Sequence, residues 1–165
     1  MREVVIVAAV RTAVGRRKGA LSNVRADDLA ADILQEVVQR AGIEKHQVED
    51  VILGCVTQTA EQGANIARTA LLMAGFPETV PGVTIDRQCG SSQQAVHFAA
   101  QAILAGDMDI AIAGGVESMT RVSMGANMQN AHEGKRLQDN YAIIHQGLSA
   151  EKNGGKMEFF KGAAK

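Results

Sequence analysis

The chain has 165 residues with 46% hydrophobic side chains, 3% aromatic ones and a formal net charge of −1, a length that supports one principal hydrophobic core. The near-neutral charge lacks the clustered excess of Lys and Arg that neutralising nucleic-acid phosphates requires. Because nothing resembles a secretory segment and no apolar run approaches the ~20 residues that cross a bilayer, we expect a cytoplasmic protein with neither a membrane nor a nucleic-acid partner.

Strand and helix patterns alternate along the first two thirds of the sequence. Short apolar runs rich in β-branched residues are typical of strands buried on both faces, and apolar residues at spacings of three and four are typical of helices. In chain order, the patterns predict a strand at 4–10, a helix at 26–41, a strand at 51–56, a helix at 65–74, a strand beginning at 83–85, a helix at 91–104 and a strand at 110–113. Such alternation predicts βαβ units with helices on the faces of a sheet, so the fold class is α/β.

Charged and polar residues mark the ends of several of these elements. Asp27 and Asp28 favour the positive end of the first helix dipole, and Gly42 follows its last turn. Asn65 is the expected N-cap of the second helix. The basic triplet at 16–18 lies in the long connection after the first strand, and we expect it to be a solvated loop.

The sequence changes character after Met119. Gly, Asn, Gln and Met replace the apolar periodicity as far as Asn140, and no element is indicated there. The end of the chain holds Lys and Gly with few apolar anchors, which predicts weak structure. We therefore divide the chain into an α/β domain at 1–119, a partial loop region at 120–151 and a tail at 152–165.

Cys89 is the candidate nucleophile. It lies where the third predicted strand meets the third helix, and such a turn holds a side chain up at the carboxyl end of a sheet. The following Gly90 leaves room for a substrate carbonyl and for unusual backbone angles. The N–H groups and dipole at the start of a helix favour a nucleophilic thiolate. The alternative interpretation is an inert buried thiol that caps the helix.

The other cysteine, Cys55, has a different setting. It lies inside an apolar strand pattern and is expected to be a small core residue. The two cysteines are far apart in different predicted elements and have no paired histidines beside them. We therefore expect neither a disulfide nor a metal site.

A nucleophilic cysteine needs a base, and the sequence has four histidines. His97 shares the predicted helix, but at ~1.5 Å per residue it lies ~12 Å along the axis from Cys89, which excludes direct contact. His46 and His132 lie beside charged or irregular sequence and are expected to be solvated. His145 is the histidine in a motif-like setting, and it is our candidate for a role in the site.

Five short segments of the sequence are recognisable. In chain order, they are residues 4–15 (VVIVAAVRTAVG), 63–68 (GANIAR), 89–91 (CGS), 114–119 (GGVESM) and 145–151 (HQGLSAE). Together they resemble successive landmarks in the N-terminal part of the thiolase family of acyltransferases. The decarboxylating condensing enzymes and the hydroxymethylglutaryl-CoA synthase branch also use a cysteine at such a strand–turn–helix junction, called the elbow below. The fourth and fifth segments of this sequence resemble thiolases more.

The resemblance implies a βαβαβαβ half-domain, with a mixed sheet covered by helices, followed by part of a CoA-binding loop region. It implies that Cys89 attacks an acyl-CoA thioester, releases CoA and carries the acyl group. The reaction would be thiolytic cleavage of a 3-ketoacyl-CoA or condensation of two acetyl-CoA molecules, in fatty acid metabolism. The N–H of Cys89 would donate to an oxyanion hole. His145 would lie near the pantetheine end of CoA, Gly90 beside the substrate, and residues 114–115 behind the elbow.

The resemblance also implies binding partners, and this sequence departs from the family pattern in two motifs. Acyl-CoA and CoA would be substrates, with no separate cofactor or metal, and the protein would be a dimer or another homo-oligomer. The family's second half supplies a histidine in a Gly-His-Pro context and a cysteine in a Cys-Gly-Gly context, and neither motif occurs in this sequence. The alternative function is therefore a non-catalytic module that binds acyl-CoA or pairs with a thiolase subunit.

Overall fold

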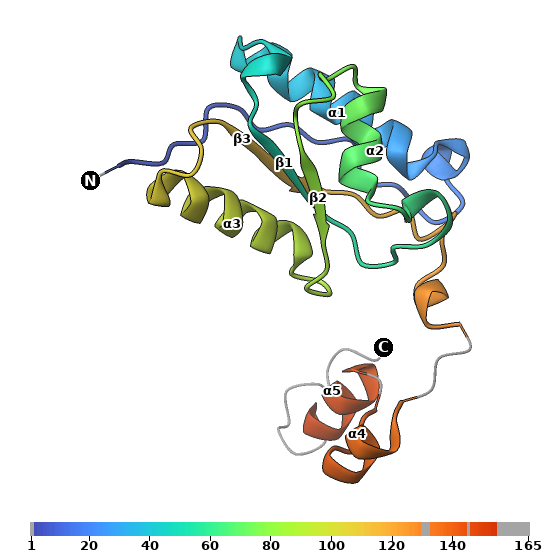
Figure 1. Cartoon of the computed structure of the whole chain (residues 1–165). Coiled ribbons are helices and arrows are strands. Elements are labelled where there is room, and N and C mark those ends of the chain that lie inside the picture. The colour runs from blue at the N-terminus through green and yellow to red at the C-terminus, as the bar shows by residue number, and fades with distance from the viewer. Residues whose placement is uncertain (1, 130–132, 145, 155–165) are drawn as a thin grey trace. The chain divides into compact units, whose positions relative to one another are not determined.

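The computed structural model describes residues 2–129, 133–144 and 146–154 of the chain. The chain divides into two compact units, Met1–Gln129 and Asn130–Lys165. The first unit has three layers, with a parallel sheet between helices (Figure 1). The α/β class expected from the sequence is confirmed.

The described part of the first unit alternates helices and strands, in the order α1 (Ala26–Ala41), β1 (Asp50–Gly54), α2 (Ile66–Met73), β2 (Gly82–Ile85), α3 (Ser91–Ala105) and β3 (Ala111–Gly115). Short 3₁₀ helices occur at η1 (Ala20–Asn23), η2 (Lys45–Gln47), η3 (Ala60–Gln62) and η4 (Ala126–Met128). The second unit holds α4 (Lys135–Asn140) and α5 (Gln146–Gly154). The helices expected at 26–41, 65–74 and 91–104 and the strands expected at 51–56, 83–85 and 110–113 are confirmed, with small shifts at their ends.

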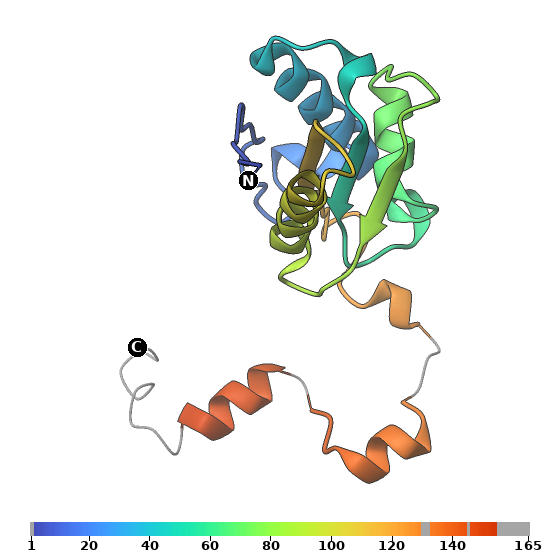
Figure 2. The same ribbon diagram turned by 60° about the vertical axis from the view of Figure 1, so that its left-hand side comes forward.

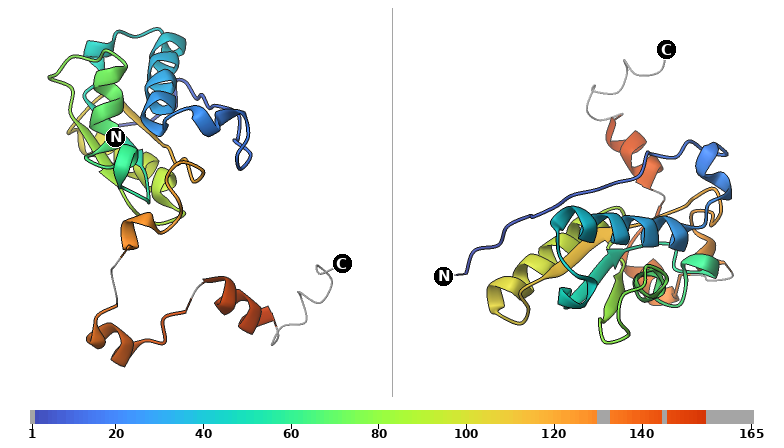
Figure 3. Two further views of the ribbon diagram at one scale, coloured as in Figure 1. Left: turned by 90° about the vertical axis from the view of Figure 1, so that its right-hand side faces the viewer. Right: turned by 90° about the horizontal axis from the view of Figure 1, so that it is seen from above.

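The sheet has the order β2–β1–β3, and both of its strand pairs are parallel. The helices α1 and α2 pack side by side on one face, and α3 covers the other face (Figures 1, 2 and 3). The central strand β1 is buried on both faces because its alternate residues enter two cores. Val51 and Leu53 join the core under α1 and α2, whereas Ile52 packs with Ala95 and Ala99 of α3.

Local sequence signals set the helix ends, as expected for Gly42 and Asn65. Gly42 and Gly106 follow α1 and α3 with φ angles of 67° and 86°, in the left-handed region that glycine enters without a steric penalty. Asn65 caps α2 because its side-chain oxygen accepts a hydrogen bond of 3.2 Å from the backbone N–H of Arg68. The basic triplet at 16–18 is exposed, as predicted.

The strand expected at 4–10 is wrong. These residues are extended but belong to no strand, and Val5, Ile6 and Val7 are 67%, 79% and 72% exposed. Residue composition indicates whether a segment is compatible with a β-sheet. A strand also needs a neighbouring strand that forms hydrogen bonds with its backbone N–H and C=O groups. The described chain therefore forms a βαβαβ unit with a wholly parallel sheet, not the expected βαβαβαβ unit with a mixed sheet.

The second unit contains structure that the sequence did not indicate. Helix α4 lies in the region where no element was expected, and an ion pair of 2.9 Å between Lys135 and Asp139, one turn apart, spans its length. Across the described residues, no helix combines the length and the apolar character needed to cross a bilayer. His145 and most of the tail at 152–165 lie outside the described residues.

A chain of four alternating charges connects the start of α1 to the segment after β3. The guanidinium of Arg25 donates two hydrogen bonds to Asp27, at 2.9 and 2.7 Å, and lies 3.6 Å from the Glu61 carboxylate. Arg121 donates two hydrogen bonds to Glu61, at 2.6 and 2.9 Å. The hydrogen bonds from Arg25 and Arg121 lower the pKa values of Asp27 and Glu61, respectively. The bidentate contact joins Arg121 to Glu61, and the ion pair from Arg25 extends the link to the start of α1, so three separate segments are held together.

We expect Asp27→Asn to lower the free energy of unfolding at pH 7 by about 1–3 kcal/mol, because a buried acceptor of two charge-assisted hydrogen bonds loses its charge. The folded-state pKa of Asp27 lies below its unfolded value. Its contribution is therefore present above about pH 4 and lost as the pH falls through the folded pKa. Urea unfolding at pH 7 and pH 3 measures both effects.

Asp28→Asn is the matched control, since Asp28 lies in the same helical turn and its carboxylate makes no hydrogen bond among the described residues. It should cost only a few tenths of a kcal/mol through the helix dipole. Equal losses for the two variants at pH 7 would contradict the assignment.

Candidate active site

Cys89 lies in the turn between β2 and α3, at the carboxyl end of the parallel sheet, and its side chain is exposed. This position matches the expected strand–turn–helix elbow and contradicts the alternative of a buried thiol. One detail of the expectation is wrong. Gly90 has ordinary angles, with φ −96° and ψ 7°, whereas Gln88 has the positive φ of 47°. The strained residue of the elbow therefore precedes the cysteine.

Side chains on both sides of Gln88 hold it in this left-handed conformation, which costs a non-glycine residue roughly 1–3 kcal/mol. The Asp86 carboxylate accepts a hydrogen bond of 2.7 Å from the Gln88 N–H. The buried Ser91 hydroxyl donates to the Gln88 carbonyl at 2.6 Å and accepts from the Arg87 N–H at 2.8 Å. The N–H of Gly90 also closes back on the Arg87 carbonyl at 3.0 Å. These bonds fix the backbone that carries Cys89.

Two glycines, Gly54 and Gly115, form the surface on which the first turn of α3 rests, and we call them the glycine floor. They lie opposite each other at the ends of β1 and β3. A Cβ atom on Gly54 would lie 2.5 Å from backbone atoms of Ser91 and Ser92, and one on Gly115 would collide with Ser92 and lie 2.7 Å from the Gly54 carbonyl. The close packing expected behind the elbow is confirmed for Gly115. Gly54 was missed, although an isolated glycine in a strand pattern indicates close backbone approach.

A second feature missed by the sequence analysis is the Glu117 carboxylate, which ties two loops together beyond the sheet. It accepts hydrogen bonds from the N–H groups of Val56 and Thr57, at 2.8 and 3.3 Å, and from the Gln62 amide at 2.7 Å. Gln62 is fully buried, and its oxygen accepts from the Ser118 N–H at 2.7 Å. The segments that follow β1 and β3 are thus fixed to each other beside the glycine floor. The available signal was a carboxylate two residues after the glycines that end a strand.

The segment at 63–68 anchors β2, the strand that leads to Cys89. Asn65 donates to the Gly82 carbonyl at 2.8 Å and accepts from the Thr84 hydroxyl at 2.8 Å. The Arg68 guanidinium donates to the Val80 carbonyl and, at 2.9 Å, to the Glu78 carbonyl. In this structure, the segment therefore holds the chain before and along β2.

Cys55 is buried at the end of β1 and cannot act as a second exposed thiol. Burial, and next the nearby Glu117 carboxylate, raise the pKa of its thiol to about 12. It remains neutral near pH 7, and the expected core role is confirmed.

The described residues bring no histidine to the elbow. His46 follows α1 in the exposed turn η2, and His97 is exposed almost two turns into α3. His132 and His145 lie outside the described residues. The site that the structure describes therefore consists of an exposed thiol, a fixed turn and the glycine floor. Such an arrangement can present a nucleophile to an electrophilic carbon, with the Cys89 N–H as a candidate donor to a developing oxyanion.

Comparison with known proteins gives consistent matches over most of the chain. The family model for the thiolase N-terminal domain matches residues 4–159. A steroid 3-ketoacyl-CoA thiolase of Mycobacterium tuberculosis is 49% identical over 128 residues, which are 78% of this chain and 31% of that protein. A 3-ketoacyl-CoA thiolase of Aeromonas hydrophila is 47% identical over 153 residues, which are 92% of this chain and 39% of that protein.

A solved structure agrees with the computed fold. The crystal structure of the Bacillus anthracis acetyl-CoA acetyltransferase superposes with a TM-score of 0.78 at 40% identity, covering 93% of this chain and 42% of that chain. The chain thus spans between about a third and two fifths of the length of these relatives.

We expect Gly54→Ala to destabilise the chain by about 1–3 kcal/mol, because the added methyl must displace the backbone of the first turn of α3. The same displacement should change the rate at which iodoacetamide alkylates Cys89. Urea unfolding and peptide mapping by mass spectrometry measure the two effects.

Gly114→Ala is the matched control in β3, because its Cβ would meet only Leu53, at an ordinary 3.7 Å. It should alter stability by less than about 0.5 kcal/mol and leave the alkylation rate unchanged. If Gly54→Ala behaves like this control, the glycine floor does not constrain the elbow.

Proposed function

The chain belongs to the thiolase family, and we propose that the protein transfers acyl groups with Cys89 as the acyl-carrying nucleophile. The observation that carries the proposal is the exposed Cys89 thiol in a fixed strand–turn–helix junction on the glycine floor. Cys55, the other cysteine, is buried with a raised thiol pKa, so it does not compete for this role.

The proposed chemistry begins when the Cys89 thiolate attacks the carbonyl carbon of an acyl-CoA thioester. A new carbon–sulfur bond forms, the oxygen becomes an oxyanion beside the Cys89 N–H, and the bond to the CoA sulfur then breaks. CoA leaves as a thiol after taking up a proton, and the acyl group remains on Cys89. Attack by another CoA thiol, or by the enolate of an acetyl-CoA, returns the free cysteine. The two directions are thiolytic cleavage of a 3-ketoacyl-CoA and condensation.

The substrates of this reaction are acyl-CoA and CoA, and we propose no separate cofactor or metal. Gly90 follows the nucleophile without a side chain and would leave space beside Cys89 for the acyl carbonyl. His145, in the segment that resembles a thiolase landmark, would lie near the pantetheine end of CoA. We also propose a cytoplasmic homo-oligomer active in fatty acid metabolism, in keeping with the family resemblance.

Among the described residues, no general base for this mechanism lies beside Cys89. Neither Gly-His-Pro nor Cys-Gly-Gly occurs in its sequence, and the described histidines lie away from the elbow. The histidine and the second cysteine would therefore come from other polypeptide, and the chain alone would perform the acylation step slowly. This same observation favours the second candidate function, a non-catalytic module that binds acyl-CoA or pairs with a thiolase subunit.

Incubation with acetyl-CoA followed by intact-mass spectrometry distinguishes the two functions. We expect one acetyl adduct on the wild-type chain, located at Cys89 by peptide mapping, and none on Cys89→Ala. Cys55→Ala should retain the adduct, because the buried thiol does not react.

A wild-type chain that binds CoA, as measured by calorimetry, but forms no adduct would contradict nucleophilic function for this chain and support the binding module. An equal adduct on Cys89→Ala would place the chemistry at another residue.

A further inference from the structure

The turn at 87–91 leaves one backbone donor free, and it belongs to the nucleophile. Within the described residues, each backbone N–H of this turn donates a hydrogen bond except that of Cys89. The acceptors are, in chain order, the Ser91 hydroxyl, the Asp86 carboxylate, the Arg87 carbonyl and the Gln88 carbonyl. Backbone N–H groups in folded proteins are nearly always paired, so the one exception in an otherwise fully bonded turn marks the group that is available to a bound molecule.

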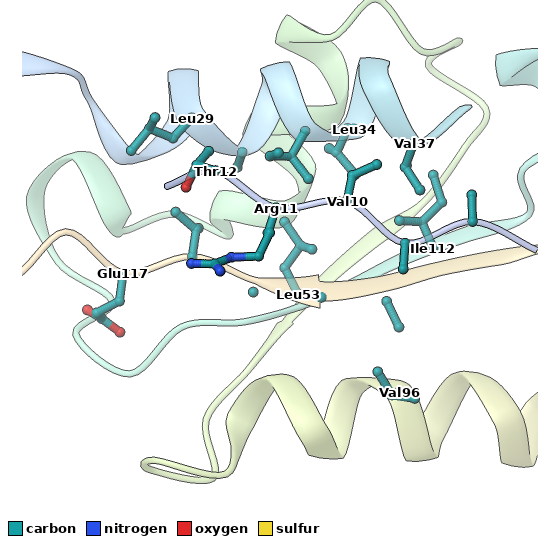
Figure 4. Close-up of a pocket in the computed structure, with 18 of the residues that line it drawn as sticks. Val10, Arg11, Thr12, Leu29, Leu34, Val37, Leu53, Val96, Ile112 and Glu117 are labelled. Carbon is teal, nitrogen blue, oxygen red and sulfur yellow. The ribbon is translucent and has the colours of Figure 1, made fainter. Parts of the chain in front are cut away.

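The free N–H of Cys89 is not stranded inside a cavity. Cys89 is exposed. The large cleft of the first unit, with a volume of about 1370 Å³, lies beside the N-terminal segment, with Val10 and Val37 on its walls (Figure 4). No residue at 86–91 lines that cleft. The N–H is therefore an accessible donor, and its lack of a partner carries no penalty for a buried, unsatisfied group.

The Ser91 hydroxyl determines the direction in which this N–H points. An N–H can only donate and a carbonyl can only accept. The hydroxyl therefore accepts from the Arg87 N–H at 2.8 Å and donates to the Gln88 carbonyl at 2.6 Å. The Gln88 carbonyl and the Cys89 N–H belong to one planar, trans peptide group, so they point in opposite directions. Because the carbonyl is held toward the first turn of α3, the N–H is turned away from the helix.

The glycine floor keeps the Ser91 side chain in place. Ser91 is 4% exposed, so solvent does not replace the bonds of its hydroxyl. Its Cβ lies only 2.7 Å from the position that a Cβ on Gly54 would occupy, so the serine packs directly on the end of β1. The Ser91 N–H adds a longer bond of 3.1 Å to the same Gln88 carbonyl. The sheet, the serine and the peptide before Cys89 are thus connected without a gap.

We propose that Ser91 is a positioning residue for acyl transfer, whose hydroxyl directs the Cys89 N–H toward the oxyanion that forms when the thiolate attacks an acyl carbonyl. The donor and the nucleophile belong to the same residue, so the oxygen of a carbonyl bonded to the Cys89 Sγ lies close to this N–H. A donor that is oriented in advance stabilises the oxyanion without reorganisation during the reaction. This inference rests on the proposed acyl transfer by Cys89 and adds the residue that orients its oxyanion donor.

Two reagents separate the orientation of the N–H from the reactivity of the thiol. Iodoacetamide alkylates Cys89 at a tetrahedral carbon and forms no oxyanion. p-Nitrophenyl acetate forms one, because the thiolate bonds to its carbonyl carbon before the bond to p-nitrophenolate breaks. Release of p-nitrophenolate measures the rate of acylation, and peptide mapping locates the acetyl group.

We expect Ser91→Ala to lower the rate of acylation of Cys89 by p-nitrophenyl acetate roughly tenfold and to leave its alkylation by iodoacetamide within about twofold of the wild-type rate. Complete loss of an oxyanion donor costs about 10²–10³ in rate, and this variant only loosens the donor. Equal losses in the two reactions overturn the proposal, because the hydroxyl would then act on the thiol or on the fold. Wild-type acylation in Ser91→Ala overturns it as well.

Ser92→Ala is the matched control. Ser92 is the next residue of α3 and also lies against the glycine floor, but its hydroxyl makes no hydrogen bond among the described residues. Both rates should equal those of the wild-type chain. A loss of acylation in Ser92→Ala as large as that in Ser91→Ala contradicts a specific role for the Ser91 hydroxyl.

The double variant Gln88→Gly/Ser91→Ala keeps the test available if Ser91→Ala does not fold. Glycine adopts the φ of 47° at position 88 without steric strain, which offsets part of the stability lost with the hydroxyl. Its acylation should be slower than that of Gln88→Gly alone, at an unchanged rate of alkylation, and equal acylation in these two variants overturns the proposal. These assays use no acetyl-CoA. Lack of an adduct from acetyl-CoA therefore contradicts the proposed function, whereas unchanged acylation by p-nitrophenyl acetate contradicts the role of Ser91.

Discussion

The close contact between α3 and the glycine floor is the constraint on which the site depends. The parallel register of β1 and β3 brings Gly54 and Gly115 opposite each other, and the absence of both side chains lets the backbone of Ser91 and Ser92 approach the sheet. Any Cβ atom at these positions would push α3 outward. Because Cys89 precedes this helix by only a short turn, the glycine floor sets how far the thiol projects from the sheet.

Several residues of the recognisable segments support this arrangement through backbone contacts. Asn65 and Arg68 hold β2 and the chain before it, and Glu117 joins the segments that follow β1 and β3. Ser91 stabilises the left-handed Gln88 directly before the nucleophile. A sequence pattern typical of an enzyme family thus includes residues that fix the backbone, because positioning a nucleophile within a fraction of an ångström requires its surroundings to be rigid.

The sequence by itself determined the features that depend on neighbours along the chain. These include the span of α1 with Gly42 after it, the cap at Asn65, the buried strand around Cys55 and the elbow position of Cys89. Only the tertiary structure decided the features that depend on distant partners. The segment at 4–10 has strand composition but pairs with no strand among the described residues. Gly54 matters because α3 begins nearly forty residues later, and Glu117 accepts hydrogen bonds from amides some sixty residues earlier. Periodicity reports which face of an element is apolar, whereas strand pairing and close backbone approach are set by which elements meet in space.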